Sequence, residues 1–115
     1  MDRNHGLTPS AFAILLSLAS GERHGYAIMR EVADAGDGRP RLGAGTLYRS
    51  IKQLRIASLI EETGQRRDPA LDDQRRRYYR LTKTGRLAVT AEAHRLDLLL
   101  AKAVQIGLVP AREKR

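Results

Sequence analysis

The sequence predicts a mainly α-helical fold with one small β-hairpin, built as a single domain that ends in a long helix. Three observations predict it. Apolar residues recur at helical spacing in three short segments of the first half of the chain. Two runs of strand-forming residues then flank a polar stretch. The segment from 83 to about 106 has helical periodicity and contains neither glycine pairs nor proline to interrupt it.

The three short helices have recognisable ends. Thr8 is expected to cap the first helix, which Ser20-Gly21 ends. The second helix is predicted from about Gly25 to Ala35 and the third from about Ala44 to Ala57. The third carries one apolar stripe, expected to face the core, at Leu47, Ile51 and Leu54.

The second half of the chain predicts two strands and the long helix. The strands are expected at Leu59–Thr63 and Arg77–Leu81, where residue types favour extended structure. Thr82 is the expected cap of the long helix, and Gly107 ends it. These elements predict three parts of the chain: helices and hairpin at 7–82, the long helix at 83–107 and a basic tail at 108–115.

The composition restricts the classes of partner. The chain has 21 Lys and Arg against 13 Asp and Glu, a net charge of +8 and a pI near 10.6. This charge favours a nucleic-acid partner, although it also suits anionic membranes and acidic proteins. The absence of cysteine excludes disulfides and Cys-ligated zinc. No apolar run approaches the roughly 20 residues that span a bilayer, so we expect no membrane contact and a cytoplasmic location.

The sequence offers no set of residues for catalysis. It lacks the nucleophile, zinc-protease and phosphate-loop motifs, and its histidines have no ligand spacing. Glu61 and Glu62 would point to opposite faces of a strand, which separates them as an acid/base pair. We therefore predict no enzyme, no catalytic residue, no metal site and no cofactor.

The positive charge is instead organised on the third predicted helix. With the apolar stripe facing inward, Arg49, Lys52 and Gln53 face outward, where such side chains can bind base edges. Gly45 and Thr46 lie at the helix N-terminus, whose free N–H groups suit a phosphate. The alternative is an ordinary solvated helix face. The predicted DNA contacts of this helix are Gly45, Thr46, Tyr48, Arg49, Lys52 and Gln53.

A second group of cations flanks the predicted hairpin loop, with three acidic residues between its two halves. These arginines would lie over phosphates, which position a protein without specifying sequence. The alternative is a charge-balanced exposed loop. A helix-turn-helix followed by a basic hairpin is the winged helix-turn-helix layout. The predicted contacts of the hairpin, or wing, are Arg66, Arg67, Arg75, Arg76 and Arg77.

The chain resembles the PadR family over about residues 7–86, in three ordered segments. They are residues 7–18 followed by His24-Gly25-Tyr26; the run Gly-Thr-Leu-Tyr-Arg-Ser-Ile-Lys-Gln-Leu at 45–54; and Leu-Ile-Glu-Glu at 59–62 with Arg-Arg-Arg-Tyr-Tyr-Arg-Leu-Thr-Lys-Thr-Gly at 75–85. The resemblance implies a winged helix whose third helix enters the major groove. It also implies dimerisation through the C-terminal helix, typically repression, and in many members a response to small molecules. A single helix after the wing is similar to the short subfamily.

Carried over by position, the resemblance implies helix contacts from Thr46, Tyr48, Arg49 and Lys52 and wing contacts from two of the arginines, Arg76 and Arg77. The chain departs from the family pattern at two places. Gly43-Ala44 stands where the family usually has Ser-Pro, which predicts a looser cap on the third helix. Ser58 stands where the family usually has the glycine that ends that helix.

The long helix carries two apolar stripes, although covering one small body needs only one. We expect one stripe to pack on its own domain and the other on a partner chain; the alternative is one broad stripe on a monomer. The predicted dimer seam is Leu87, Ala91, His94, Leu98 and Ala101. The second stripe is Val89, Ala93, Leu96, Leu100 and Ala103.

Together these patterns predict a sequence-specific regulator of transcription that binds double-stranded DNA, a repressor that binds a palindromic operator as a homodimer. Two alternatives are left open: a winged-helix module for protein interaction, and an adaptor that binds nucleic acid without sequence preference. A small-molecule effector is also left open. The long helix lacks aromatic residues that would stack on a flat ligand.

Overall fold

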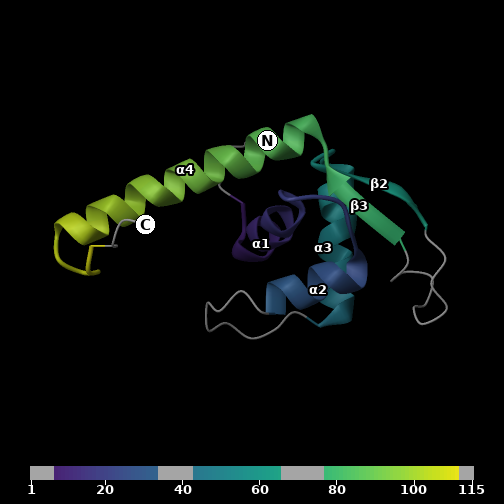
Figure 1. The fold of residues 1–115 in the computed structure, drawn as a ribbon, viewed down its shortest axis with the longest axis horizontal. Coiled ribbons are helices and arrows are strands. Elements are labelled where there is room, and N and C mark those ends of the chain that lie inside the picture. The colour runs from purple at the N-terminus through teal and green to yellow at the C-terminus, as the bar shows by residue number, and fades with distance from the viewer. Residues whose placement is uncertain (1–6, 34–42, 66–76, 112–115) are drawn as a thin grey trace.

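The computed structural model describes residues 7–33, 43–65 and 77–111. Its elements in chain order are α1 (Pro9–Leu18), β1 (Arg23–His24), α2 (Gly25–Ala33), α3 (Ala44–Ile56), β2 (Ile60–Gln65), β3 (Arg77–Leu81) and α4 (Lys83–Gln105). The three short helices and the strands form one body, and α4 runs along it past α1 and extends well beyond it (Figure 1).

Side chains cap the first two helices. The Thr8 hydroxyl accepts a hydrogen bond of 3.1 Å from the Ala11 N–H, which confirms the predicted start of α1. At α2 the same task falls to His24, whose Nδ1 accepts a 3.0 Å hydrogen bond from the Ala27 N–H. The His24 ring also lies edge-on to Tyr78, with the ring centres 5.2 Å apart. His24 is therefore a packing and capping residue, in line with its lack of ligand spacing.

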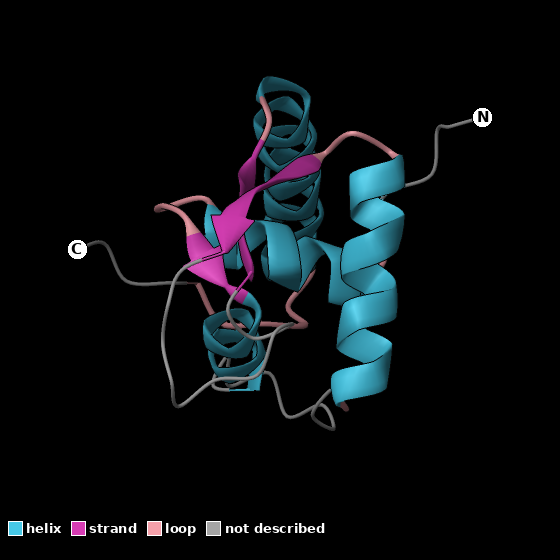
Figure 2. Ribbon diagram, turned by 90° about the vertical axis from the view of Figure 1, so that its right-hand side faces the viewer, coloured by secondary structure: helices cyan, strands magenta, loops and turns pink. Residues whose placement is uncertain are grey.

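The sheet has three strands, so the prediction of a two-stranded hairpin was one strand short. Its order is β1-β3-β2 and both pairings are antiparallel. Arg23 pairs with Tyr79 and His24 with Tyr78, while β2 pairs with β3 from the other side. A strand of two residues has no alternating pattern to detect, and its partner lies more than 50 residues away in the sequence. Figure 2 shows this sheet standing beside α3.

The core forms where α1, α3 and the sheet meet. Ile14, Leu15 and Leu18 of α1 are fully buried, and Tyr79 of β3 packs against them. All three stripe residues of α3 are buried too, which confirms the predicted stripe. Ile28, Ile60 and Val89 bring α2, β2 and α4 to the same cluster. The inward faces of all the helices thus meet in one core.

The turn from α3 to β2 requires an unusual backbone conformation. Ser58 has φ +64°, in the left-handed region. The Leu59 N–H donates to the Leu54 carbonyl at 3.0 Å, and the Ser58 N–H donates to the Arg55 carbonyl at 2.9 Å. This pair of bonds is the Schellman motif, in which glycine usually occupies the left-handed position. The departure from the family pattern at this position therefore places an L-residue in a strained conformation.

Replacing Ser58 with glycine is expected to stabilise the chain by about 1 kcal/mol, because the left-handed region disfavours residues with a Cβ. The midpoint of thermal unfolding, followed by circular dichroism, should rise by about 4 °C. Ala57→Gly is the control, because Ala57 has an ordinary φ of −78° and should lose stability as glycine. A lower midpoint for Ser58→Gly would contradict this reading of the turn.

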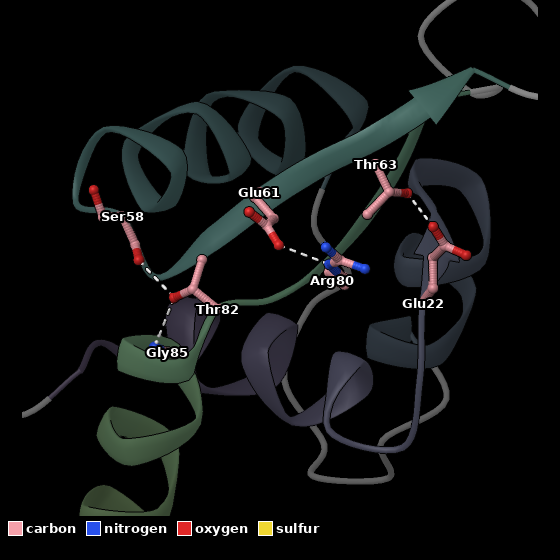
Figure 3. A network of polar contacts seen from close by, with 7 residues as sticks. All are labelled: Glu22, Ser58, Glu61, Thr63, Arg80, Thr82 and Gly85. Atoms are coloured by element: carbon pink, nitrogen blue, oxygen red, sulfur yellow. Dashed lines mark hydrogen bonds and ion pairs between the residues drawn. The ribbon is translucent and has the colours of Figure 1, made fainter.

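Thr82 joins the same turn to α4 (Figure 3). Its hydroxyl accepts a 2.9 Å hydrogen bond from the Gly85 N–H and donates one of 2.6 Å to the Ser58 carbonyl. Its own N–H donates to the Leu59 carbonyl at 3.1 Å. The predicted cap is therefore confirmed, and the cap also fixes the first turn of α4 against the α3–β2 turn.

The far end of α4 closes as the glycine predicts. Gly107 has φ +86°, and the Leu108 N–H donates to the Ala103 carbonyl at 2.9 Å. The predicted basic tail falls partly on residues 112–115, which lie outside the described residues. In the part of the chain that the structure describes, no helix is long and apolar enough to cross a membrane.

Candidate nucleic-acid interface

The outer face of α3 presents the predicted polar residues together. Thr46, Arg49, Lys52 and Gln53 are exposed, while the apolar stripe on the opposite face is buried. The Arg49 guanidinium donates a 3.3 Å hydrogen bond to the Thr46 hydroxyl one turn earlier. The inward and outward faces that the spacing predicted for this helix are thus confirmed. The DNA contacts of these residues stay predictions.

The N-terminus of α3 is open. Gly43 occupies the capping position, and its lack of a side chain leaves the first turn without a side-chain cap. A Cβ built on Gly45 would meet no atom of the described residues within 4 Å. This end combines N–H groups that need partners with room for an approaching phosphate. It agrees with the looser cap expected from Gly43-Ala44.

Tyr48 lies at the junction of α2 and α3 rather than wholly on the outer face. Its ring lies against Gly25, where an added Cβ would come within 2.6 Å of the Tyr48 hydroxyl oxygen. The side chain is partly buried against the core. Tyr48 therefore helps to fix the angle between the two helices. The predicted DNA contact of this residue stays a prediction.

One of the predicted wing arginines, Arg77, lies among the described residues. Arg77 begins β3 with an exposed side chain and pairs with Gln65 across the hairpin. A bulge interrupts β2 between Glu62 and Gly64, where Gly64 takes φ +133°. The other predicted wing residues, Arg66, Arg67, Arg75 and Arg76, lie outside the described residues.

Two acidic side chains of β2 have separate arginine partners, as their opposite directions predict. Glu61 accepts a 2.7 Å hydrogen bond from Arg80, which raises the pKa of Arg80 further. Glu62 lies 3.3 Å from Arg55 of α3 and 3.9 Å from Arg77. Burial, and next the Glu62 charge, raise the pKa of the neighbouring Tyr79, so its ring stays neutral in the core. The contacts of Glu62 could not be predicted from the sequence, because they link residues of different elements.

The two stripes of α4 have different surroundings. All five residues of the predicted seam are exposed, and Leu87 and Leu98 are large apolar side chains among them. In the second stripe Val89 is buried in the core, whereas Ala93, Leu96 and Leu100 are exposed. The domain thus covers this stripe only near the start of α4. Beyond it the helix leaves the body (Figure 1), and Leu96, Leu98 and Leu100 are exposed there, whereas Ala103 and Val104 are half-buried near the end of the helix.

Glu92 of α4 is buried, which the sequence did not predict. Glu92 faces the body and forms a two-pronged ion pair with Arg95, at 2.6 and 3.0 Å. This hydrogen bonding, together with a backbone hydrogen bond from Leu7, lowers the pKa of Glu92. The ion pair with Arg95 thus favours the charged form of this buried carboxylate. Helical periodicity of apolar residues cannot detect such a contact.

Other kinds of site are limited within the described residues. No group of His, Asp or Glu side chains among them could hold a metal ion. An open groove of about 580 Å³ lies between α1 and α2. Its walls combine apolar side chains, Leu16 and Val32 among them, with Arg23 and Arg30. Within the lining, Arg23 donates a 2.6 Å hydrogen bond to the Ser17 carbonyl and lies 3.8 Å from the Glu31 carboxylate.

Comparison with known families gives one match over most of the chain. The model described as "Transcriptional regulator PadR-like family" matches residues 14–91. A search of curated protein sequences gave no significant match.

Several solved structures are similar in fold. A PadR family transcription regulator from Clostridium difficile is 21% identical, with a TM-score of 0.70 over 86% of this chain and 98% of that one. RosR of H. salinarum is 28% identical, with a TM-score of 0.63 over 89% and 82%. BpsR of Bordetella bronchiseptica, whose DNA binding is regulated by 6-hydroxynicotinic acid, is 22% identical, with a TM-score of 0.67 over 95% and 73%.

Proposed function

Because the chain belongs to the PadR-like family of transcriptional regulators, we propose that it is a repressor that binds a palindromic operator as a homodimer. Membership makes it a DNA-binding transcriptional regulator with a winged-helix fold, and not an enzyme. The observation that carries the proposal is the outer face of α3, where Arg49, Lys52 and Gln53 are exposed over a fully buried apolar back.

In the proposed complex α3 lies in the major groove. Arginine can bind guanine through two hydrogen bonds, and glutamine can bind adenine in the same way, so Arg49 and Gln53 are the proposed base contacts. Thr46 and the N–H groups beside Gly45 would bind a backbone phosphate. The wing arginines, Arg77 among them, would bind phosphates at the edge of the groove and fix the orientation of α3.

The proposed homodimer forms through the seam of α4. Support comes from the exposed apolar residues Leu87 and Leu98, which would otherwise face water on a helix that leaves the body. A two-fold dimer would place two α3 helices about 34 Å apart, one turn of DNA. Residues 7–82 would then bind DNA and α4 would set the half-site spacing. We expect the dimer to act in the cytoplasm.

Two other functions are tested by the same measurement. A winged-helix module for protein interaction, or an adaptor without sequence preference, would use the same positive charge without binding bases specifically. Control by a small molecule, as in the Bordetella bronchiseptica neighbour, stays a prediction for this chain.

The test is a titration of the purified protein against duplex DNA from its own upstream region and against a scrambled duplex of equal length. At about 150 mM salt non-specific binding is weak, so a preference of about a thousandfold is expected for a specific regulator. Footprinting should then show two half-sites related by symmetry. Equal, salt-sensitive binding to both duplexes would contradict the proposal and favour the adaptor.

Replacing Arg49 with alanine is expected to weaken operator binding by about 1–3 kcal/mol, because a base contact is lost. Binding to the scrambled duplex should change much less. Arg30→Ala is the matched control, because it removes another exposed arginine, which lies on α2 and is not among the proposed base contacts. Equal losses for both variants would mean that Arg49 contributes only charge. Unchanged operator affinity would remove Arg49 from the base contacts.

A further inference from the structure

One carboxylate connects the two elements that carry the proposed DNA contacts. Glu62 of β2 places Oε1 3.3 Å from Nη1 of Arg55, in the last turn of α3. It places Oε2 3.9 Å from Nε of Arg77, the first residue of β3. Each guanidinium thus has its own oxygen, so the carboxylate bridges the two arginines instead of choosing between them.

The position of Glu62 in the sheet lets this bridge fix how the hairpin lies relative to α3. On the partner strand Glu62 is opposite Tyr79, whose ring is fixed in the core. The bulge between Glu62 and Gly64 follows at once in β2, and Gly64 takes φ +133° there. The bridge therefore joins the end of α3 to β2 immediately before the bulge.

The exposure of the three side chains indicates that the bridge contributes little to the stability of the fold. Glu62 is 24% exposed, against 43% for Arg55 and 45% for Arg77. Ion pairs with this much solvent contact contribute little to the free energy of unfolding. A negative charge on a surface meant for phosphates also opposes binding. Such a carboxylate is useful there only if holding the two arginines in place outweighs its repulsion of DNA.

We propose that Glu62 is a positioning residue that holds the β2–β3 hairpin at a fixed distance and angle from α3, so that both reach one DNA duplex. Its effect on DNA affinity rests on the proposed function. The positioning itself is a property of the free protein and can be measured without DNA.

The chain supplies a matched control on the adjacent residue. Glu61 forms a 2.7 Å pair with Arg80 on the opposite face of β2, away from α3 (Figure 3). Glu61→Gln and Glu62→Gln therefore remove the same charge from the same strand, and each breaks an arginine contact. Of the two, only Glu62→Gln removes an ion pair between the hairpin and α3.

The first measurement is the distance between α3 and the hairpin in the full chain. The sequence has no cysteine, so cysteines introduced at Gln53 and Gln65 would carry the only two spin labels. Double electron–electron resonance should give a narrow distribution of label distances in the labelled protein with Glu62 intact and in its Glu61→Gln variant. The distribution should broaden or shift for Glu62→Gln. An unchanged distribution in Glu62→Gln would overturn the proposal.

The second measurement is operator affinity without labels. Loss of a negative charge alone would tighten DNA binding, whereas loss of positioning should weaken it, so the sign of the change identifies the cause. We expect Glu62→Gln to bind about fivefold more weakly, a change of about 1 kcal/mol. Glu61→Gln should bind as well as the unchanged protein or slightly better. Equal or tighter operator binding by Glu62→Gln would overturn the proposed role in affinity.

Thermal unfolding of both variants shows whether a substitution acts by destabilising the fold. Both midpoints should lie within a few degrees of that of the unchanged protein. If the unchanged protein shows no preference for its operator, the proposed function fails. The label distances then decide by themselves whether Glu62 positions the hairpin.

Discussion

Replacing Gly85 with alanine is expected to cost the chain about 3 kcal/mol of stability or more, and to lower the midpoint of thermal unfolding by more than about 10 °C. A Cβ at position 85 would lie 1.8 Å from the carbonyl oxygen of Leu59 and 2.8 Å from its carbonyl carbon. Both atoms belong to the backbone, so no side chain can rotate to make room. The first turn of α4 would have to move away from the α3–β2 turn.

That movement would break a connected set of hydrogen bonds. The Leu59 carbonyl accepts from the Thr82 N–H, and the Thr82 hydroxyl is bonded to both Gly85 and Ser58. These bonds fix the direction in which α4 leaves the body. Gly85→Ala should therefore disturb α4 even in molecules that remain folded, and loss of helical signal should accompany the lower midpoint.

Gly45→Ala is the matched control for Gly85→Ala. Both glycines lie in the first turns of helices, but a Cβ on Gly45 would meet no atom of the described residues within 4 Å. Alanine favours helices over glycine by about 1 kcal/mol, so Gly45→Ala should unfold at the same temperature or higher. A stable Gly85→Ala protein with native α4 signal would show that the close approach of Leu59 is not required.

Features that depend on residues close together in the sequence could be predicted, whereas features that depend on distant residues could not. Thr8 and Thr82 were predicted as caps because a cap depends on residues three positions apart. The burial of Leu47, Ile51 and Leu54 was predicted because helical spacing alone fixes a shared face. The exposed face of α3 follows from the same geometry, so the α3 part of the candidate site could be placed from the sequence, except for Tyr48.

The features that escaped prediction depend on contacts between distant segments. β1 is two residues long and is defined only by its pairing with β3. The Glu62 bridge joins α3, β2 and β3, and the charge pattern of any one of them does not indicate it. The packing of the Tyr48 ring against α2 was not predicted either, because it depends on the absence of a side chain at Gly25, on another helix.

Replacing Leu98 with aspartate is expected to convert the proposed dimer into monomers. In a two-fold interface the residue occurs twice at the same seam, so each dimer would bury two uncompensated charges. Burying such a charge costs several kcal/mol, which should weaken association by about a thousandfold or more. Sedimentation at micromolar concentration should then show the mass of one chain. Operator binding should weaken as well, because two half-sites would no longer be held together.

Leu99→Asp provides the control that makes this test specific to one face of α4. Leu98 and Leu99 are 59% and 54% exposed, so neither change should harm the fold of the single chain. Leu99 belongs to neither predicted stripe, and helix geometry turns it about 100° from Leu98. If only Leu98→Asp gives monomers, the seam lies where periodicity places it. If only Leu99→Asp does, the seam is rotated by one residue. If both remain dimers, the subunits associate through another surface and the apolar side chains of α4 need a different explanation.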